Sequence, residues 1–323
     1  MIKLNGYTID FGVFPNGESF ADIPESITPY AYDVYRENFM SKFIYKDGYN
    51  KIHLKFENDA DIYHLFCIKD YVDTKWPNLP CILEMPYIPY SRMDRQEEKR
   101  LFTLKTFANI INSMNFITVR VMEPHSEVSV ALIDRVQVEN KSADLALKAM
   151  RDVLDLRGSC WLQDSIYGTD DMNMSGMFNK ARDAGIYLVY PDAGAEKRYR
   201  KQITYNKILT CSKDRDFNTG NIKSIVVNGA EQAQDCKIAI ITDDLSSKGG
   251  TFCGAAKAIR EAIPSVEHII LCVTHCENTI YVGNVLSGVE IDKVYTTNSI
   301  LVEPGFNEVT NFDKNKLIVE DIR

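Results

Sequence analysis

Short apolar runs bounded by turn-forming residues recur along the chain, and each has the length and composition of a buried β-strand. The clearest runs are PCILEMPYI at about 80 to 88, FITVRVME at 116 to 123, GIYLVYPD at 185 to 192, KIAIITDD at 237 to 244, and HIILCVTH at 268 to 275. Segments with helical spacing lie between them: LFTLKTFANIINSMN (101 to 115), ADLALKAMRDVLDLRG (143 to 158) and FCGAAKAIREAI (252 to 263). Alternation of strand and helix predicts an α/β protein with mainly parallel sheets flanked by helices.

The length of the chain favours two domains. It has 323 residues, and a single hydrophobic core seldom serves more than about 250 to 300 residues. The strand and helix pattern is interrupted near Asn140, in the segment QVENKSAD. We therefore expect one domain over 1 to 140, a second over 141 to 305, and a polar tail over 306 to 323 whose KLIVEDI segment adds one more strand.

Charge and hydropathy exclude several partners. The formal net charge is -8 and the isoelectric point is about 5.3, so the chain lacks the basic surface that nucleic-acid binding requires. No run approaches the ~18 apolar residues of a membrane span, and the start MIKLNGYTIDFG lacks the pattern of a secretory signal. We expect a cytoplasmic protein that binds neither nucleic acid nor membranes.

The cysteines do not indicate a disulfide framework or a zinc site. None forms a CxxC pair, and they are scattered at positions 67, 81, 160, 211, 236, 253, 272 and 276. Cys272 and Cys276 flank His275, but no second ligand pair accompanies them. Reduced structural thiols are the favoured interpretation.

The stretch KIAIITDDLSSKGGTFCGAAKAI carries the strongest chemical signal, because a buried strand leads through two acids and a small-residue loop into a helix. Ligands of parallel sheets bind at the carboxyl ends of the strands. The carboxylates of Asp243 and Asp244 suit the two hydroxyls of a ribose. The backbone N–H groups of Gly249 to Thr251 open a helix and suit a phosphate. The simpler alternative is an acidic turn that only caps the helix.

This stretch resembles the phosphoribosyltransferase signature, and in particular that of the ribose-phosphate diphosphokinases, also called phosphoribosyl pyrophosphate synthetases. The family pattern is two acids, two spacers and then Asp-Thr-x-Gly-Thr. The resemblance implies two phosphoribosyltransferase-like domains and a ribose-phosphate site formed by Asp192, Asp243, Asp244, Ser246, Ser247, Lys248, Gly249, Gly250 and Thr251. Ser247 and Lys248 depart from the family, which has an acid and a threonine there.

The segment MPYIPYSRMDRQ resembles the family's Tyr-Ala-Arg-Gln-Asp-Arg segment, which contacts ATP. Arg92, Asp94 and Arg95 match, whereas Met93 replaces a glutamine. Guanidinium groups suit a polyphosphate because each can make two parallel charge-assisted bonds. Taken alone, the segment would be a solvated surface run.

His125, just beyond the strand VRVME, resembles the histidine of the family's Asp-Leu-His element, which contacts the metal–triphosphate unit. Asp192, in PDAGAEKRYRK, resembles the aspartate of the family's Pro-Asp-x-Gly-Gly segment, although Ala195 replaces its second glycine. The resemblance implies that His125 and Asp192 are on the Mg²⁺ side of the site. An isolated histidine is more often structural, and an Asp-Gly turn is common in any protein.

The segment LTCSKDRDFNTGN, residues 209 to 221, is polar and contains glycine, so we expect a mobile loop. Lys213 and Arg215 reproduce the spacing of the basic pair in the family's catalytic flexible loop. The resemblance implies that both cations, together with His125 and Asp243, are catalytic. As a bare pattern, Lys-x-Arg carries almost no information.

Near the amino terminus, VFPNGESF resembles the family's Phe-x-Asp-Gly-Glu turn, which reaches the ATP site of a neighbouring subunit. Phe14 and Glu18 match and Asn16 replaces the aspartate. The resemblance implies a homo-oligomer built from dimers, with a hexamer as the larger option. It covers residues 14 to about 275 in the family's order, but 30 to 78 and 155 to 182 depart from it.

The activity that the resemblance implies is transfer of the β,γ-pyrophosphate of Mg-ATP to the anomeric hydroxyl of a ribose 5-phosphate moiety, with release of AMP. Lys248 adds a cation where the 5-phosphate would bind, which favours an acceptor whose phosphate continues further, such as ADP-ribose. Divergent phage-type relatives associated with NAD rebuilding share such departures. Ribose 5-phosphate, a non-catalytic regulatory protein and a plain phosphoribosyltransferase remain the alternatives.

Overall fold

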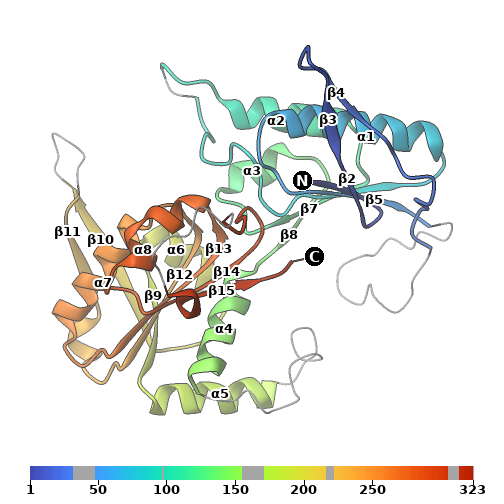
Figure 1. Cartoon of the computed structure of the whole chain (residues 1–323). Helices are drawn as coiled ribbons and strands as arrows, with labels where there is room; N and C mark the ends of the chain where they lie inside the picture. The colour runs from blue at the N-terminus through green and yellow to red at the C-terminus, as the bar shows by residue number, and fades with distance from the viewer. Residues whose placement is uncertain (32–47, 97, 155–170, 216–221, 305–312, 323) are drawn as a thin grey trace. The chain divides into compact units, whose positions relative to one another are not determined.

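The computed structural model describes residues 1–31, 48–96, 98–154, 171–215, 222–304 and 313–322. The chain divides into two compact units, an amino-terminal unit over Met1–Glu139 and a carboxy-terminal unit over Asn140–Arg323. Figure 1 shows a sheet with helices in each unit. None of the helices in the described part of the chain is both long and apolar enough to cross a membrane.

The amino-terminal unit has a six-stranded sheet in the order β2-β1-β5-β6-β7-β8. Strands β5 to β8 are parallel, and β1 pairs antiparallel with both β2 and β5. A separate antiparallel hairpin is formed by β3 and β4. The strands are β1 (Ile2–Leu4), β2 (Tyr7–Ile9), β3 (Phe11–Val13), β4 (Ser19–Ala21), β5 (Asn50–Leu54), β6 (Cys81–Glu84), β7 (Thr118–Met122) and β8 (Val136–Glu139), and the helices are α1 (Ala60–Lys75), α2 (Thr103–Ser113) and α3 (Glu127–Leu132).

The core of this unit follows from alternation along its strands. In β5 the side chains of Ile52 and Leu54 are fully buried, whereas Lys51 and His53 between them are half-buried on the other face. Residues spaced by three or four along α1 and α2 pack on the apolar face, as expected for helices with one apolar stripe. They are Leu65, Ile68, Val72, Leu104, Phe107, Ala108 and Ile111.

The carboxy-terminal unit has a seven-stranded sheet in the order β11-β10-β9-β12-β13-β14-β15. All neighbours are parallel except the β10–β11 pair. The strands are β9 (Ile186–Tyr190), β10 (Ile208–Arg215), β11 (Ile222–Asn228), β12 (Ile238–Ser246), β13 (His268–Cys276), β14 (Lys293–Thr297) and β15 (Leu317–Glu320). The helices are α4 (Ser142–Val153), α5 (Asp171–Asp183), α6 (Ala193–Tyr199), α7 (Gly250–Ala262) and α8 (Asn284–Ser287), and the 3-10 turns are η1 (Ala230–Gln232), η2 (Asn278–Val282) and η3 (Lys314–Lys316).

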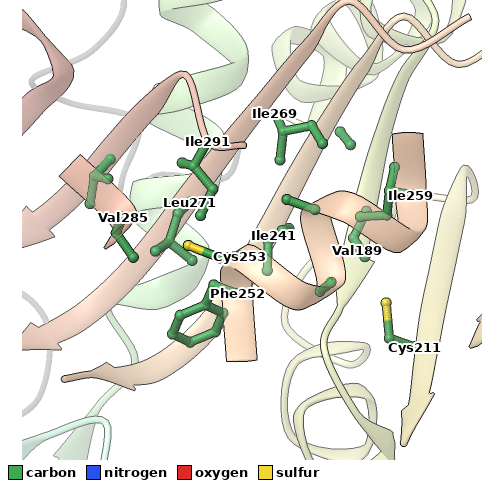
Figure 2. Packing of buried hydrophobic residues seen from close by; sticks show 14 of the residues in the cluster. Val189, Cys211, Ile241, Phe252, Cys253, Ile259, Ile269, Leu271, Val285 and Ile291 are labelled. Carbon is green, nitrogen blue, oxygen red and sulfur yellow. The ribbon is translucent and has the colours of Figure 1, made fainter. Parts of the chain in front are cut away.

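Both faces of this sheet are covered, so its central strands are mostly apolar up to their carboxyl ends. Along β13, Ile269 and Leu271 join the core beneath α7, and Ile270 and Cys272 join the core beneath α4 and α5. Figure 2 shows the first of these cores, with Phe252 and Ile259 of α7 facing strand residues such as Leu271. Two packed layers hold the strands in place, and with them the residues at their carboxyl ends.

The predicted fold class is confirmed, and the mainly parallel sheets contain all five apolar runs. Two local expectations were wrong. The strand was expected to end at Asp243 and Asp244, but β12 continues to Ser246 because β13 extends to Cys276 and pairs with it. The backbone of Lys213 and Arg215 was expected in a loop, but it lies in β10, which pairs with β11; residues 216 to 221 of that predicted loop lie outside the described part of the chain.

Candidate acceptor and nucleotide site

The predicted residues of the carboxy-terminal unit lie on three consecutive strands of its sheet. Asp192 follows β9, the two acids Asp243 and Asp244 are in the last part of β12, and Lys213 is in β10 on the other side of β9. Because these strands are parallel, their carboxyl ends meet at one edge of the sheet. For Lys213 and Arg215 the structure places the backbone, and their side chains lie outside its description.

Three carboxylates of this edge interact with one another. Burial raises the pKa of Asp243 well above its ordinary value, and the charges of Asp244 and Asp192 raise it further. The Asp192 carboxylate accepts a hydrogen bond of 3.0 Å from the N–H of Ala195 and so caps α6. A site that concentrates negative charge in this way favours a ligand that donates hydrogen bonds, such as a diol, or a cation.

Arg198 supplies the counter-charge. Its Nη1 lies 3.2 Å from Oδ2 of Asp244, whose side chain is only 6% exposed. Arg198 is on α6, the helix that Asp192 begins, so one short helix provides both a carboxylate and the cation that balances its neighbour. In the sequence Arg198 is only one of several basic residues after the Pro-Asp segment, and nothing there identifies it as the partner of Asp244.

A buried polar network lies behind the acids. The hydroxyl of Ser142, at the start of α4, donates to the carbonyl of Asp243 over 3.1 Å and lies 2.9 Å from the hydroxyl of Thr274. On the next strand, Nδ1 of His275 lies 2.8 Å from the hydroxyl of Ser299. These contacts fix the strand that carries the acids, and they place His275 between the buried Cys272 and Cys276 as a structural residue.

The segment between β12 and α7 has the shape of a phosphate-binding loop. Gly249 has φ +77°, which favours glycine, and a Cβ atom there would lie 1.9 Å from Cγ2 of Val285. Helix α7 then begins at Gly250, with Thr251 in its first turn, so the free N–H groups of a thirteen-residue helix open toward the loop. Lys248 is exposed, whereas Ser247 donates a hydrogen bond to the carboxylate of Glu277.

In the amino-terminal unit, most of the predicted nucleotide-binding residues follow two adjacent parallel strands. The segment with Arg92, Asp94 and Arg95 follows β6, and His125 follows β7, so both come from the same edge of that sheet. Arg92 and Arg95 are exposed, whereas Asp94 and His125 are half-buried. Both arginines and the histidine already interact with neighbouring groups.

The predicted turn near the amino terminus is the tip of the β3–β4 hairpin. The N–H of Phe14 donates to the carbonyl of Glu18 over 2.8 Å, and the N–H of Glu18 donates to the side chain of Asn16 over 3.1 Å. Gly17 has φ +90° at this turn. The rings of Phe14 and Phe20 lie 4.5 Å apart on the hairpin, and both are exposed.

The predicted magnesium residues His125 and Asp192 belong to different units. Among the described residues, no group of three or more His, Cys, Asp or Glu side chains could hold a metal ion by itself. Mg²⁺ commonly binds through one or two carboxylates together with substrate phosphates, and Asp192 fits that pattern because it is half-buried beside Asp243. The site is therefore suited to a metal that arrives with a nucleotide.

The fold is that of a phosphoribosyl pyrophosphate synthetase. A crystal structure of the synthetase from Mycobacterium smegmatis matches 98% of this chain and 86% of its own with a TM-score of 0.58, at 16% sequence identity.

Curated relatives agree with the fold. The ribose-phosphate pyrophosphokinases of Sulfurisphaera tokodaii and Sulfolobus acidocaldarius are 25% and 23% identical, and both alignments cover 97% of this chain and 91% of the relative. The enzyme of the same name from Vibrio parahaemolyticus is 24% identical over 74% of this chain and 68% of its own. No protein-family model matches the chain. The chain is a divergent relative of the ribose-phosphate pyrophosphokinases.

Proposed function

We propose that this protein is a diphosphokinase that transfers the β,γ-pyrophosphate of Mg-ATP to the anomeric hydroxyl of a ribose 5-phosphate moiety. One observation carries the proposal: a paired acid, a phosphate-binding loop and a helix start follow one another in the strand–loop–helix from Ile238 to Ala262, beside Asp192. The names of the relatives support the same reaction.

In this mechanism Asp243 and Asp244 accept hydrogen bonds from the ribose hydroxyls, and the loop from Ser246 to Thr251 binds the phosphate. The anomeric hydroxyl loses its proton to solvent as its oxygen forms a bond to the β-phosphorus of ATP, the bond from that phosphorus to the oxygen bridging it to the α-phosphorus breaks, and AMP leaves with that oxygen. Such transfers depend on positioning and on stabilisation of charge.

Cationic side chains would stabilise the charge that develops on the transferred group. The four candidates are Arg92, Arg95, Lys213 and Arg215. Mg²⁺, held through Asp192 and His125, would neutralise the phosphates of ATP.

The acceptor that we favour is ADP-ribose, which would yield ADP-ribose pyrophosphate for NAD rebuilding. Lys248 is exposed on the phosphate loop, where a cation could pair with the second phosphate of such an acceptor. Ribose 5-phosphate is the other candidate. AMP release measured with ATP, Mg²⁺ and each acceptor separates them, and activity with ribose 5-phosphate alone would exclude ADP-ribose.

Replacing both Lys213 and Arg215 by alanine tests the activity itself. We expect AMP formation to fall by at least ~100-fold while the melting temperature stays near that of the unchanged protein, because these cations act on the transferred group. Lys207→Ala is the matched control, since Lys207 precedes the same strand but pairs with Asp235. Unchanged turnover in the double variant would refute the assignment.

A regulatory, non-catalytic role is the second candidate, favoured by the departures at Asn16, Met93, Ser247 and Lys248. Titration calorimetry with ATP and with each acceptor distinguishes the two. Absence of nucleotide binding would support the regulatory role.

We also propose that the protein acts in the cytoplasm as a homo-oligomer, with the β3–β4 hairpin reaching a second copy. The exposed rings of Phe14 and Phe20 on that hairpin support this arrangement. Sedimentation velocity of the protein and of a Phe14→Ser variant tests it, and a monomer at micromolar concentration would exclude it.

A further inference from the structure

Glu277, immediately after β13, is bound to the phosphate loop through both its backbone and its side chain. Its N–H donates to the carbonyl of Ser246 over 2.8 Å, and its carboxylate accepts a hydrogen bond from the hydroxyl of Ser247. The hydroxyl of Thr279 lies 3.4 Å from the same carboxylate oxygen. The loop is therefore joined to the neighbouring strand by a charge-assisted hydrogen bond.

The chain after Glu277 packs closely against the rest of the loop. A Cβ atom on Gly283 would lie 2.4 Å from the carbonyl oxygen of Lys248, and a Cβ atom on Gly249 would overlap Val285. The segment from Glu277 to Val285 thus contacts the loop at Ser246, Ser247, Lys248 and Gly249 in turn. Contacts at four successive residues leave the loop backbone little freedom, and they hold Lys248 with its side chain exposed.

The position of this carboxylate has an electrostatic consequence. The family pattern has an acid where this chain has Ser247, and that acid would be part of the loop itself. Here the carboxylate belongs to Glu277, which follows the next strand, and it accepts a hydrogen bond from Ser247. The loop has the cation of Lys248 in addition. The exposed cation of Lys248 can pair with a second phosphate attached to the bound one.

We propose that Glu277 is a positioning residue of the acceptor site: it holds the phosphate loop through Ser247 and leaves the cation of Lys248 exposed, so that the site accepts a ribose whose 5-phosphate continues into a second phosphate. This inference rests on the proposed function. Glu277 acts through Ser247 and the loop backbone.

Glu277→Gln keeps the size of the side chain and removes its charge. We expect the KM for ADP-ribose, and its Kd measured by calorimetry without ATP, to rise by about tenfold, because a neutral amide accepts a weaker hydrogen bond from Ser247 than a carboxylate does and holds the loop less firmly. The kcat and the melting temperature should change little. Glu290→Gln is the matched control: Glu290 lies later in the same connection and pairs with Lys257, 3.3 Å away.

A reciprocal exchange tests specificity. Ser247→Asp alone puts two carboxylates together and should weaken binding of both acceptors. Ser247→Asp combined with Glu277→Gln returns a single acid to the loop, and it should bind ribose 5-phosphate more tightly than Ser247→Asp does while ADP-ribose stays weak.

Three outcomes are distinguishable. If the unchanged protein binds an acceptor but releases no AMP, the proposed function fails and the calorimetric arm still tests Glu277. If Glu277→Gln binds both acceptors as the unchanged protein does, or if the double variant binds ribose 5-phosphate no better than Ser247→Asp, the inference is overturned. A lower kcat and a lower melting temperature together with the higher KM would overturn it too, because they would show a purely structural role.

Discussion

The acids of the proposed acceptor site repel one another. Asp243 and Asp244 are consecutive, and the nearby Asp192 adds a third negative charge. Arg198 forms an ion pair with Asp244, one of these three acids. A ligand with hydroxyl groups or a cation would relieve the repulsion, so the site is prepared for binding at the expense of its own stability.

Arg198→Ala should expose the contribution of this ion pair. Removing one partner leaves the buried carboxylate of Asp244 uncompensated, which costs up to about 3 to 5 kcal/mol for fully buried pairs. Because Arg198 is itself 30% exposed, we expect a loss of about 2 kcal/mol in the free energy of unfolding, measured by urea titration.

Arg200→Ala is the control for that measurement. Arg200 directly follows the same helix and pairs with Glu196 four residues earlier, and its side chain is 62% exposed. Its replacement should change the free energy of unfolding by less than about 0.5 kcal/mol. Equal losses in the two variants would show that the pair with Asp244 has no special role.

Asp243→Asn should stabilise the protein without substrates while removing acceptor binding. The pKa of Asp243 is raised in the folded state, so the folded protein binds more protons than the unfolded chain from about pH 4 up to that raised pKa. The free energy of unfolding therefore falls as pH rises through this window. The variant should melt at a higher temperature than the unchanged protein at pH 7.5, and the difference should disappear near pH 4.

Asp235→Asn should change the melting temperature in the opposite direction to Asp243→Asn. Hydrogen bonds from Lys207 and Tyr187 lower the pKa of Asp235, so its stabilising effect is present at neutral pH and is lost as pH falls through the folded-state pKa. This variant should melt at a lower temperature at pH 7.5. A rise in melting temperature for both variants would contradict the assignment for Asp243.

At the residue scale, the sequence predicts local features well and distant partners poorly. The acids, the glycines and the loop departures at Ser247 and Lys248 are adjacent in the chain, so their order alone suggested a site. Glu277 lies thirty residues from Ser247, and its partner becomes visible only when β12 and β13 are placed side by side. Ser142 is hidden for the same reason, since it is 101 residues from Asp243.

At the element scale, the turn from β12 into α7 depends on one glycine conformation. Gly249→Ala would place a Cβ atom in a left-handed residue and against Val285. We expect a loss of at least about 2 kcal/mol in the free energy of unfolding, because strain in that region and overpacking each cost about 1 to 3 kcal/mol.

The neighbouring glycine provides the control for this experiment. Gly250 begins α7, and a Cβ atom there would meet no atom within 4 Å, so Gly250→Ala should be neutral or stabilising. Adding Val285→Ala to Gly249→Ala should restore part of the loss. Equal effects of the two glycine variants would argue against the steric explanation.

Element type could be predicted from the apolar runs, whereas the ends of the elements could not. The polar sequence around Lys213 suggested a loop, yet its backbone is a strand because Lys213 pairs with Ile225 of β11 and Arg215 with Ile222. Pairing between strands decides such cases, and it is invisible in the local pattern. The added length of β12 has the same origin.

At the scale of the whole molecule, each unit has its own hydrophobic core among the described residues. One cluster, which contains Leu83 and Phe107, lies in the amino-terminal unit, and the clusters around Ile241 and Ala149 lie in the carboxy-terminal unit. Units with separate cores can fold separately. That the amino-terminal domain binds ATP and the carboxy-terminal domain binds the ribose phosphate is a prediction from the sequence.

A fragment of residues 140 to 323 should therefore unfold cooperatively on its own. It contains the proposed acceptor residues, so calorimetry should show binding of ribose 5-phosphate or ADP-ribose. It lacks Arg92, Arg95 and His125, so it should release no AMP from ATP. Cooperative unfolding without acceptor binding would show that the site needs the amino-terminal unit.

The continuation of β12 beyond its acids has a kinetic consequence. Asp243 pairs with Val273 and Leu245 with His275, so the strand is still part of the sheet where the ligand would arrive. A sugar phosphate would then dock on a surface that is already assembled, and its association should follow a single concentration-dependent phase. Amide hydrogens along this ladder should exchange with solvent only when the whole carboxy-terminal sheet opens, whether or not a ligand is bound.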